Sequence, residues 1–406
     1  MPKTAVTGDG HTIKHEAIRM PEVSGNAVIV GIGETRVGKL PGMNSQEIQA
    51  WAVQEAIADS GLALHDIDGL VNLDPYQTPN SMFSTTMSEY LGIKPSFSST
   101  VDVGGTVTGM TMLQQAVWAI DAGHCRNVVC VFGENPQTSR PTGTHGFMLK
   151  NALGGEEWEE PYGVQGMVMQ YAMTAQRYMH ETGSTEADLG AVAVSARQHA
   201  LLNDNAMMKK PITLEDHRAS RMIASPLRLL DCSIVADGGG ALVLTSAERA
   251  RRMGARAVRV RSMAMRCTHN SVAAHPDLED IGMWDAGKRC FEAAGVGPED
   301  VDVAELHDAF TISILLTLDA LGITKPGEAG AFMRSGQGTL GGRCPVNTHG
   351  GLLSQAHVGG ILHLVEAVRQ LRGEAGRRQV EDARLALVSG NGGIFSVCGA
   401  MLMERV

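Results

Sequence analysis

Two histidines in the second half of the chain stand where a side chain could transfer a proton. His307 follows a predicted buried strand, in the run His307-Asp308-Ala309-Phe310, and His357 lies in the segment GGRCPVNTHGGLLSQAHVGG at the predicted start of a helix. Open α/β sheets bind ligands at the carboxyl ends of strands, and the positive end of a helix dipole keeps an imidazole neutral. A neutral imidazole can act as a general base. We therefore predict a proton-transfer site built on His307 and His357.

The elements that must position these histidines occur twice in the chain. Residues 60–76 match residues 294–310 at Gly61/Gly295, Asp66/Asp300, Asp68/Asp302 and Asp74/Asp308. Residues 105–123 and 355–373 share their length and apolar rhythm, and each segment leads into a β-branched strand. Duplication at this scale indicates two packed pseudo-symmetric halves. Each histidine taken alone could merely satisfy backbone groups in a tight turn, but their placement at matching ends of duplicated units favours catalysis.

Strands and helices alternate along both halves, which indicates a layered α/β fold. The apolar run 27–35 predicts a buried strand, and Ser45 is predicted to cap a helix that ends near Ser60. Residues 134–225 break this alternation with Gly and Pro punctuation and an acidic stretch. We therefore expect an arm over residues 1–24, a first half over residues 25–250 that contains a lid domain at about 134–225, and a second half over residues 251–406.

Composition narrows the function classes. The 406 residues are 43% hydrophobic and allow a large core, while the net charge of -10 argues against a nucleic-acid surface. The sequence has no run of 18 apolar residues and no hydrophobic N-terminal stretch, which predicts a cytoplasmic protein without a membrane span. Seven scattered cysteines indicate reduced thiols, with no disulfide framework or metal site. The GxGxxG, GxSxG and Walker patterns are absent, which disfavours dinucleotide binding, esterase activity and nucleotide hydrolysis.

Several ordered motifs carry a family resemblance. The succession PLRLLDCSIVADGGGALVL, HDAF, VNTHGGLLSQAH and LVEAVRQLRG resembles the thiolase superfamily, in particular its sterol-carrier-protein-type and lipid-transfer thiolase-like branch. This resemblance covers nearly all of residues 27–406. It implies a five-layered αβαβα thiolase fold of two duplicated halves with an inserted loop domain, a tight homodimer, and a site for an acyl-CoA substrate without any other bound cofactor or metal.

The resemblance also implies roles for individual residues. His307 corresponds to a histidine that helps to form an oxyanion hole, and His357 falls where the family has a catalytic base. Asn347, Gly350 and Gly351 match the NxxGG turn and are expected to fix the loop that aims His357. The three reactive sulfur positions are empty, because this chain has Thr106 in place of the nucleophilic cysteine, Ala309 in the HDAF turn and the run SGNGG (389–393) in the third place.

Chemistry without these thiols leaves three hypotheses. Retro-aldol cleavage of a bulky β-hydroxyacyl-CoA, of steroid side-chain or aromatic type, needs no covalent step, only a base and donors to the thioester enolate. His357 or His307 would be the base, with the backbone amides of Gly392 and Gly393 as donors. The first alternative is thiolysis or acyl transfer of an unusual β-ketoacyl-CoA with Thr106 or a migrated thiol as nucleophile. The second alternative is a non-catalytic subunit that binds acyl-CoA.

The resemblance finally predicts a partner. Some cysteine-lacking members of this branch are steroid side-chain aldolases that work with a small protein of an OB-fold and a zinc ribbon. Those aldolases carry tyrosines at the positions of His307 and His357, so this chain departs from them at both. The acyl group and the direction of the reaction are therefore open at the level of sequence.

Overall fold

The computed structural model describes residues 26–77, 79–139, 159–164, 166–270, 277 and 281–406, so the predicted arm and part of the predicted lid lie outside the described residues. The first half contains β1 (Ala27–Glu34), α1 (Ser45–Ser60), β2 (Gly69–Asn72), α2 (Phe83–Leu91), β3 (Phe97–Thr100), α3 (Val107–Asp121), β4 (Asn127–Glu134), β7 (Gly238–Ser246) and α8 (Ala247–Met253). Between β4 and β7 lie α5 (Met167–Thr182), α6 (Glu186–Ala200), α7 (Leu214–Ala219), β5 (Met222–Ala224) and β6 (Leu227–Arg228). The second half contains β8 (Val258–Cys267), α9 (Gly282–Ala294), β9 (Val303–Glu305), α10 (Thr311–Ala320), α11 (Ala329–Arg334), α12 (Ile361–Arg372), β10 (Leu385–Gly392) and β11 (Val397–Arg405).

The strands of both halves form one mixed nine-stranded sheet in the order β3-β2-β4-β7-β1-β8-β11-β10-β9. In the first half β2 runs parallel to β4, and β4 pairs antiparallel with β7. In the second half β9 runs parallel to β10, and β10 pairs antiparallel with β11. The two halves meet at the pairing of Ile29 in β1 with Val258 in β8. The repeated order of pairings confirms that the chain consists of two duplicated halves.

The duplication extends to the turns that connect helix and strand. Helix α1 ends at Gly61 with φ 71°, and α9 ends at Gly295 with φ 65°. A short 3-10 turn follows each glycine, and each turn leads into the corresponding strand, β2 or β9. Glycine suits both places because the left-handed conformation is costly for a residue with a Cβ. The sequence match between the two segments therefore reflects a shared backbone path.

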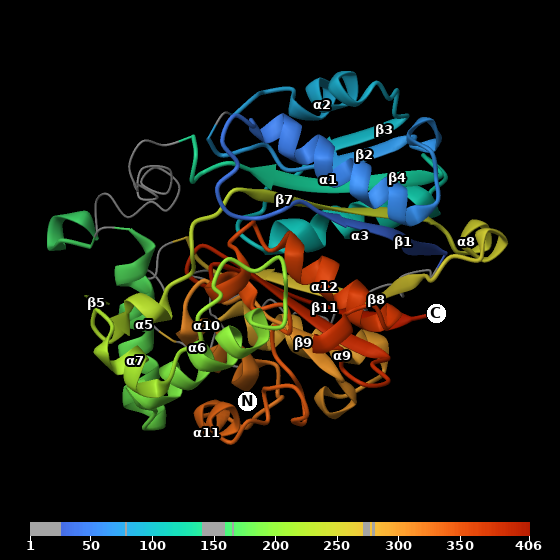
Figure 1. Cartoon of the computed structure of the whole chain (residues 1–406). Coiled ribbons are helices and arrows are strands. Elements are labelled where there is room, and N and C mark those ends of the chain that lie inside the picture. Colours follow the sequence, from blue (N-terminus) through green and yellow to red (C-terminus); the bar gives the residue numbers. More distant parts are fainter. Residues whose placement is uncertain (1–25, 78, 140–158, 165, 271–276, 278–280) are drawn as a thin grey trace, which may run out of the picture.

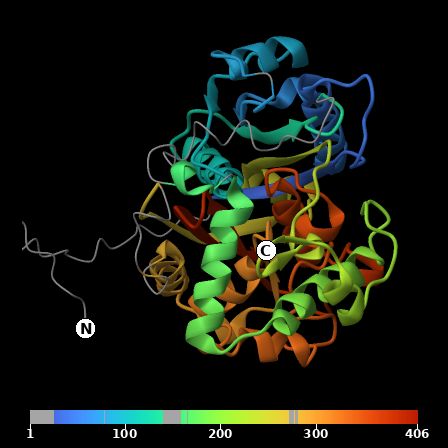
Figure 2. The same ribbon diagram turned by 90° about the vertical axis from the view of Figure 1, so that its left-hand side faces the viewer.

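The layers predicted from the family resemblance are present. In Figure 1 the strands of the first half lie above those of the second half, with α3 and α12 between them. Helix α3 contacts β4 and β10, and α12 contacts β7 and β10, so these helices touch strands of both halves. Helix α1 covers the outer face of the first half and α9 that of the second. Figure 2 shows the green helices of the loop domain packed over the second half.

Burial explains why β4, β7 and β10 are mostly apolar. Every residue of β4, β7 and β10 is buried except Ser246, because these strands are covered on both faces. Helix α1 has the predicted bounds, but the prediction that Ser45 caps it is wrong. Asn44 is the cap, with Glu47 completing a capping box, and Ser45 is the first helical residue. Within the described residues, no helix is long and apolar enough to cross a membrane.

Candidate active site

The candidate site lies where three turns meet at one end of the sheet. Strands β9 and β10 run parallel, with Val388 paired to Glu305, so their carboxyl ends open toward the same edge. His307 follows β9, and Asn391 lies at the end of β10. Thr106 is the residue before α3 and belongs to the first half. The site therefore combines both halves, although its histidines come from the second.

Thr106 and His307 are in direct contact. The Thr106 Oγ1 atom lies 3.0 Å from Nδ1 of His307, and the backbone N–H of Asn391 donates to the same oxygen at 2.8 Å. The carbonyl of Asn391 also accepts from the Thr106 N–H at 3.1 Å. Glycine makes this close approach possible, because a Cβ on Gly105 would lie 2.2 Å from the Asn391 carbonyl oxygen. The sequence placed Thr106 in the nucleophile's position, and the structure shows that it bonds to the histidine.

His307 is held as a neutral imidazole. Burial, with a smaller contribution from the nearby His357, lowers its pKa to about 3. The distance between Thr106 Oγ1 and His307 Nδ1 is shorter than the 3.4 Å from Thr106 Oγ1 to the Asn391 carbonyl oxygen. We therefore infer that the Thr106 hydroxyl donates its hydrogen bond to an unprotonated Nδ1. The ring proton is then on Nε2, which is buried and has no hydrogen-bond partner within the described residues. His307 can thus offer an N–H group to a bound molecule.

His357 is oriented by a segment that the sequence analysis did not select. Its Nδ1 lies 3.0 Å from Ser233 Oγ, and its backbone N–H donates to the Ile234 carbonyl at 3.2 Å. The expectation that His357 stands at a helix N-terminus is wrong, because α12 begins at Ile361 and His357 forms an isolated parallel bridge with Val235. The two glycines before Ile361 delay the helix, since both have positive φ. Ser233, and not a helix N-terminus, is therefore the polar group that contacts the His357 ring.

The same segment also reaches the turn of His307. The Ser233 N–H donates to the Ala309 carbonyl at 2.8 Å, and Cys232 forms an antiparallel bridge with Phe310. Residues 232–235 thus tie together the two histidine-bearing turns. A signal for this role existed in the sequence, because Ser233 is part of the motif PLRLLDCSIVADGGGALVL on which the family resemblance rests.

Asp308 links the two turns a second time. Its Oδ1 accepts from the Leu352 N–H at 2.8 Å and lies 3.3 Å from Nε2 of His363. Burial would raise the pKa of Asp308, but His363 and the Leu352 N–H lower it, so the carboxylate stays charged. A Cβ on Gly351 would lie 1.9 Å from Asp308 Oδ2. Glycine at position 351 is therefore required for the carboxylate to approach this turn.

The other predicted loop-positioning residues lie in the same turn. Asn347 has φ 54°, and its side chain both accepts from the Leu306 N–H at 2.6 Å and donates to the Leu306 carbonyl at 2.8 Å. Gly350 also has positive φ, and a Cβ there would lie 2.7 Å from that of Ala200. Asn347 thus holds Leu306, the residue between β9 and His307.

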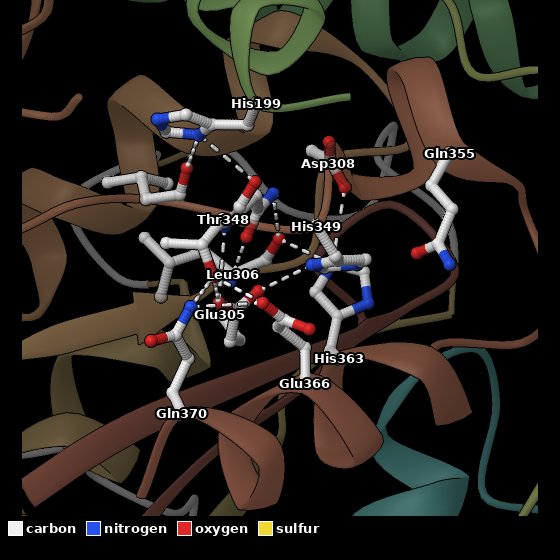
Figure 3. A network of polar contacts seen from close by, with 12 residues as sticks. His199, Glu305, Leu306, Asp308, Thr348, His349, Gln355, His363, Glu366 and Gln370 are labelled. Atoms are coloured by element: carbon white, nitrogen blue, oxygen red, sulfur yellow. Dashed lines mark hydrogen bonds and ion pairs between the residues drawn. The ribbon is translucent and has the colours of Figure 1, made fainter. Parts of the chain in front are cut away.

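A buried ionic network supports these turns from below, as Figure 3 shows. Nδ1 of His349 lies 2.7 Å from Oε2 of Glu305, and the Thr348 hydroxyl bridges Glu305 and Glu366 at 2.8 and 2.9 Å. Burial opposes a charged His349, but Glu305 and Glu366 outweigh it and raise its pKa. Arg378 likewise outweighs burial and lowers the pKa of Glu366. Removing one partner of such a pair would leave an uncompensated buried charge, so this network fixes the loop between α11 and α12.

The run SGNGG closes the site from the other side. A Cβ on Gly392 would lie 2.5 Å from the Gly104 carbonyl oxygen, which packs this run against the start of α3. Gly393 has φ 61°, and its carbonyl accepts from the Tyr171 hydroxyl at 3.1 Å. The N–H group that reaches Thr106 is that of Asn391, one residue before the two predicted donors. Asn391 and Tyr171 were not predicted as site residues, because neither stands out in the sequence by type or spacing.

A cavity opens beside Ser233. Its volume is about 530 Å³, and its wall combines apolar side chains with three basic residues of the loop domain. The wall includes Ile212, Met207, Met208, Leu229, Leu230, Cys232, Ser233, Leu353, Arg197, Lys209 and Lys210. Such a lining suits a long ligand that carries an apolar part and negative charges.

The cysteines do not supply a reactive thiol to this site. Cys232 is the one cysteine on the cavity wall, and burial raises its pKa to about 12. Its thiol contacts the Arg228 carbonyl, and that of Cys398 contacts the Phe395 carbonyl. Burial also raises the pKa of Cys398. Thiol nucleophiles react as thiolates, so neither group is suited to attack a thioester.

Fold and site together define a thiolase-fold protein with two histidines at its candidate site. Residues 264–405 match the family described as "Thiolase C-terminal domain-like". The chain is 37% identical over 361 residues to the 17-hydroxy-3-oxo-4-pregnene-20-carboxyl-CoA lyase of Mycobacterium tuberculosis, covering 86% of this chain and 92% of that protein. It is 35% identical over 384 residues to the steroid side-chain-cleaving aldolase of Thermomonospora curvata, covering 92% of this chain and 97% of that protein.

A solved structure agrees with these relatives. The Ltp2-ChsH2(DUF35) aldolase superposes with a TM-score of 0.84 at 34% identity, covering 94% of this chain and 98% of that chain. The chain therefore belongs to the thiolase superfamily, in its sterol-carrier-protein-like branch, as the sequence motifs predicted.

Proposed function

We propose that this protein makes or breaks a carbon-carbon bond in a β-hydroxyacyl-CoA by aldol chemistry, without a covalent acyl-enzyme. The observation that carries the proposal is the contact of 3.0 Å between Thr106 and a neutral His307, in the place where a thiolase has its cysteine. Two of its relatives are named as a CoA lyase and a side-chain-cleaving aldolase, which supports carbon-carbon bond cleavage by the same class of reaction.

His357 is the base in this proposal. When its Nδ1–H donates to Ser233 Oγ, Nε2 carries the lone pair that takes the proton of the β-hydroxyl. The bond between Cα and Cβ then breaks, the β-carbon becomes a ketone or an aldehyde, and the electron pair forms the thioester enolate. The proton on His357 returns to Cα to give a shortened acyl-CoA. Atoms and electrons balance without a co-reactant.

His307 is the enolate's hydrogen-bond donor. Its Nε2–H is buried and fixed before the substrate arrives, which is the condition for strong electrostatic stabilisation of developing charge. A pKa of about 3 makes His307 a poor base, so the structure favours His357 over His307 for proton abstraction.

The cavity beside Ser233 is the proposed path of the coenzyme A moiety. Lys209 and Lys210 can form ion pairs with its phosphates, and the apolar side chains of the cavity wall can pack against its pantetheine arm. The acyl group would be bulky, of steroid side-chain or aromatic type, as in the names of the relatives.

The test is to incubate the purified protein with panels of β-hydroxyacyl-CoA and β-ketoacyl-CoA thioesters and to follow products by mass spectrometry. Release of a ketone or an aldehyde with a shortened acyl-CoA, without consumption of free CoA, is the expected result. Cleavage that needs free CoA would contradict the proposal.

Acyl transfer with Thr106 as nucleophile is the second candidate, because a hydroxyl 3.0 Å from an imidazole nitrogen is also the geometry of an activated nucleophile. The two candidates differ for Thr106→Val, which keeps the shape and removes the hydroxyl. We expect a loss of about tenfold from a missing hydrogen bond to His307, whereas loss of a nucleophile would cost at least about 10³-fold. Thr106→Ser is the control, and a covalent acyl adduct on Thr106 would establish the second candidate.

Two partners belong to this proposal. The name of the Ltp2-ChsH2(DUF35) aldolase joins two components, and we expect this chain to work with a small protein of an OB-fold and a zinc ribbon. We also expect a homodimer through β3, one of the two edge strands of the sheet. Light scattering of the chain alone and of the copurified complex tests both.

The seven free cysteines support a reducing compartment, the cytoplasm.

A further inference from the structure

Tyr171 of the loop domain reaches the centre of the site. It lies on α5, is fully buried, and its hydroxyl donates to the Gly393 carbonyl at 3.1 Å while accepting from Asn391 Nδ2 at 3.0 Å. Its ring packs on Phe310 and Phe395, with centroids 4.5 and 5.7 Å away. One side chain of the inserted domain therefore touches both the HDAF turn and the SGNGG run.

The contacts of Asn391 fix which way its amide points. Its Oδ1 accepts from the Phe395 N–H at 3.1 Å, which leaves Nδ2 to donate to Tyr171. Phe395 has φ 58°, a conformation that costs a residue with a side chain and persists only where its surroundings hold it. The Asn391 amide and the Tyr171 ring are two such restraints.

The same asparagine holds Thr106. Its backbone N–H donates to Thr106 Oγ1 at 2.8 Å, and Thr106 Oγ1 lies 3.0 Å from His307 Nδ1. A continuous series of hydrogen bonds thus runs from Tyr171 through Asn391 and Thr106 to His307. The Asn391 N–H occupies one lone pair of Thr106 Oγ1, and the hydroxyl proton of Thr106 then points at His307. Each hydrogen bond in the series therefore constrains the next.

We propose that Tyr171 is a positioning residue for His307, which sets the orientation and the tautomer of the imidazole through Asn391 and Thr106. This inference rests on the proposed function, in which His307 must present Nε2–H to the enolate. It assigns to the loop domain a part in catalysis that is separate from substrate binding. Without the Tyr171 hydroxyl, Asn391 Nδ2 is left buried without a partner, and the run that carries the Asn391 N–H relaxes away from Thr106.

The first test is kinetic. Tyr171→Phe keeps the ring and removes the hydroxyl, and we expect kcat to fall about tenfold while KM for the acyl-CoA changes less than about twofold. The matched control is Tyr178→Phe on the same helix, whose hydroxyl donates to Asp319 Oδ2 at 2.6 Å. Tyr178→Phe should lower thermal stability by about as much as Tyr171→Phe does, because each variant loses one buried hydroxyl, but it should leave kcat unchanged. Equal losses of kcat in both variants would overturn the inference.

A double-mutant cycle separates positioning from general loosening. If Tyr171 acts through Thr106, Tyr171→Phe should add less than about twofold to the loss of kcat already caused by Thr106→Val. Independent effects would multiply to about a hundredfold, and that outcome would show that Tyr171 does not act through Thr106.

A measurement without substrate distinguishes failure of this inference from failure of the proposed function. In protein labelled with ¹⁵N-histidine, the His307 imidazole is assigned by its loss in His307→Leu. We expect the Nε2–H tautomer in the wild type and a mixture of tautomers in Tyr171→Phe, with Tyr178→Phe unchanged. An unaltered His307 spectrum in Tyr171→Phe would refute the inference even if the lyase is active, and a shift would support it even if the true reaction is acyl transfer.

Discussion

The turns after β2 and β9 are aligned copies of one unit, yet only the second belongs to the candidate site. Leu73 and Asp74 occupy the positions of His307 and Asp308. Asp74 is half-buried and accepts from the N–H of Asn80 in its own loop at 2.9 Å. Asp308 is fully buried and accepts from Leu352, 44 residues along the chain. The same local unit therefore forms a partly exposed turn in one half and a buried part of the candidate site in the other.

The pKa values of the two carboxyl groups are also shifted in opposite directions. Burial raises the pKa of Asp74, and its few partners do not reverse that shift. Burial also acts on Asp308, but His363 and the Leu352 N–H lower its pKa below the ordinary value. What distinguishes the two copies is thus the set of groups that the tertiary structure brings to each turn.

The largest expected effect concerns the histidines themselves. Replacing the base in His357→Gln should lower kcat by about 10²–10⁴-fold, the usual worth of general base catalysis. His124→Gln changes an exposed histidine of the first half that stacks on Phe97, and its kcat should equal that of the wild type. Steady-state kinetics with a cleaved β-hydroxyacyl-CoA makes the comparison. A His357→Gln enzyme with more than a tenth of wild-type kcat would exclude His357 as the base.

The two aspartates should differ strongly in their contribution to folding. Asp308→Asn removes a buried charge beside His363 and weakens the hydrogen bonds from the Leu352 and Leu353 N–H groups, so we expect the free energy of unfolding to fall by about 3 kcal/mol. Asp74→Asn should cost about 1 kcal/mol or less, because it loses only local bonds. Urea denaturation of both variants measures the difference. Equal losses would mean that the two copies are energetically equivalent after all.

The pH dependence of stability should carry a signature of His307. Its pKa in the folded protein is about 3, against 6.5 for an ordinary histidine, so between these values the unfolded chain binds a proton that the folded chain does not. This contribution to stability is present above pH 6.5 and declines as the pH falls, with a slope of up to about 1.4 kcal/mol per pH unit.

His307→Leu tests this directly, because it installs the residue of the first copy, the buried Leu73. Urea denaturation at pH 7, 6 and 5 should show a smaller loss of unfolding free energy on acidification than in the wild type. Parallel losses in the two proteins would show that His307 is not responsible.

The smallest effect should be the same in both copies. Gly61 and Gly295 end α1 and α9 in the left-handed conformation, and no atom would lie within 4 Å of a Cβ at either position. Gly61→Ala and Gly295→Ala should each cost about 1 kcal/mol from backbone strain alone, without a change in kcat. A large difference between the two costs would break the equivalence of the helix-to-strand turns.

Much of the fold could be predicted because its signals are local. The apolar runs at β1 and β4 and the helix Ser45–Ser60 are read from periodicity, and the matched glycines and aspartates revealed the duplication. The motif residues His307, His357 and Thr106 were also selected from the sequence. His357 was misplaced at a helix N-terminus, since two positive-φ glycines before Ile361 set a later start that hydrophobic periodicity does not record.

The sequence by itself determined that the chain has two thiolase-like halves, and it selected His307, His357 and Thr106 as candidate site residues. Only the tertiary structure decided how those histidines are held. Thr106 meets His307 across 201 residues, Ser233 meets His357 across 124, and Tyr171 meets Asn391 across 220. Such contacts depend on how distant elements close on one another to within a hydrogen-bond length, and no pattern of neighbouring residues specifies that distance.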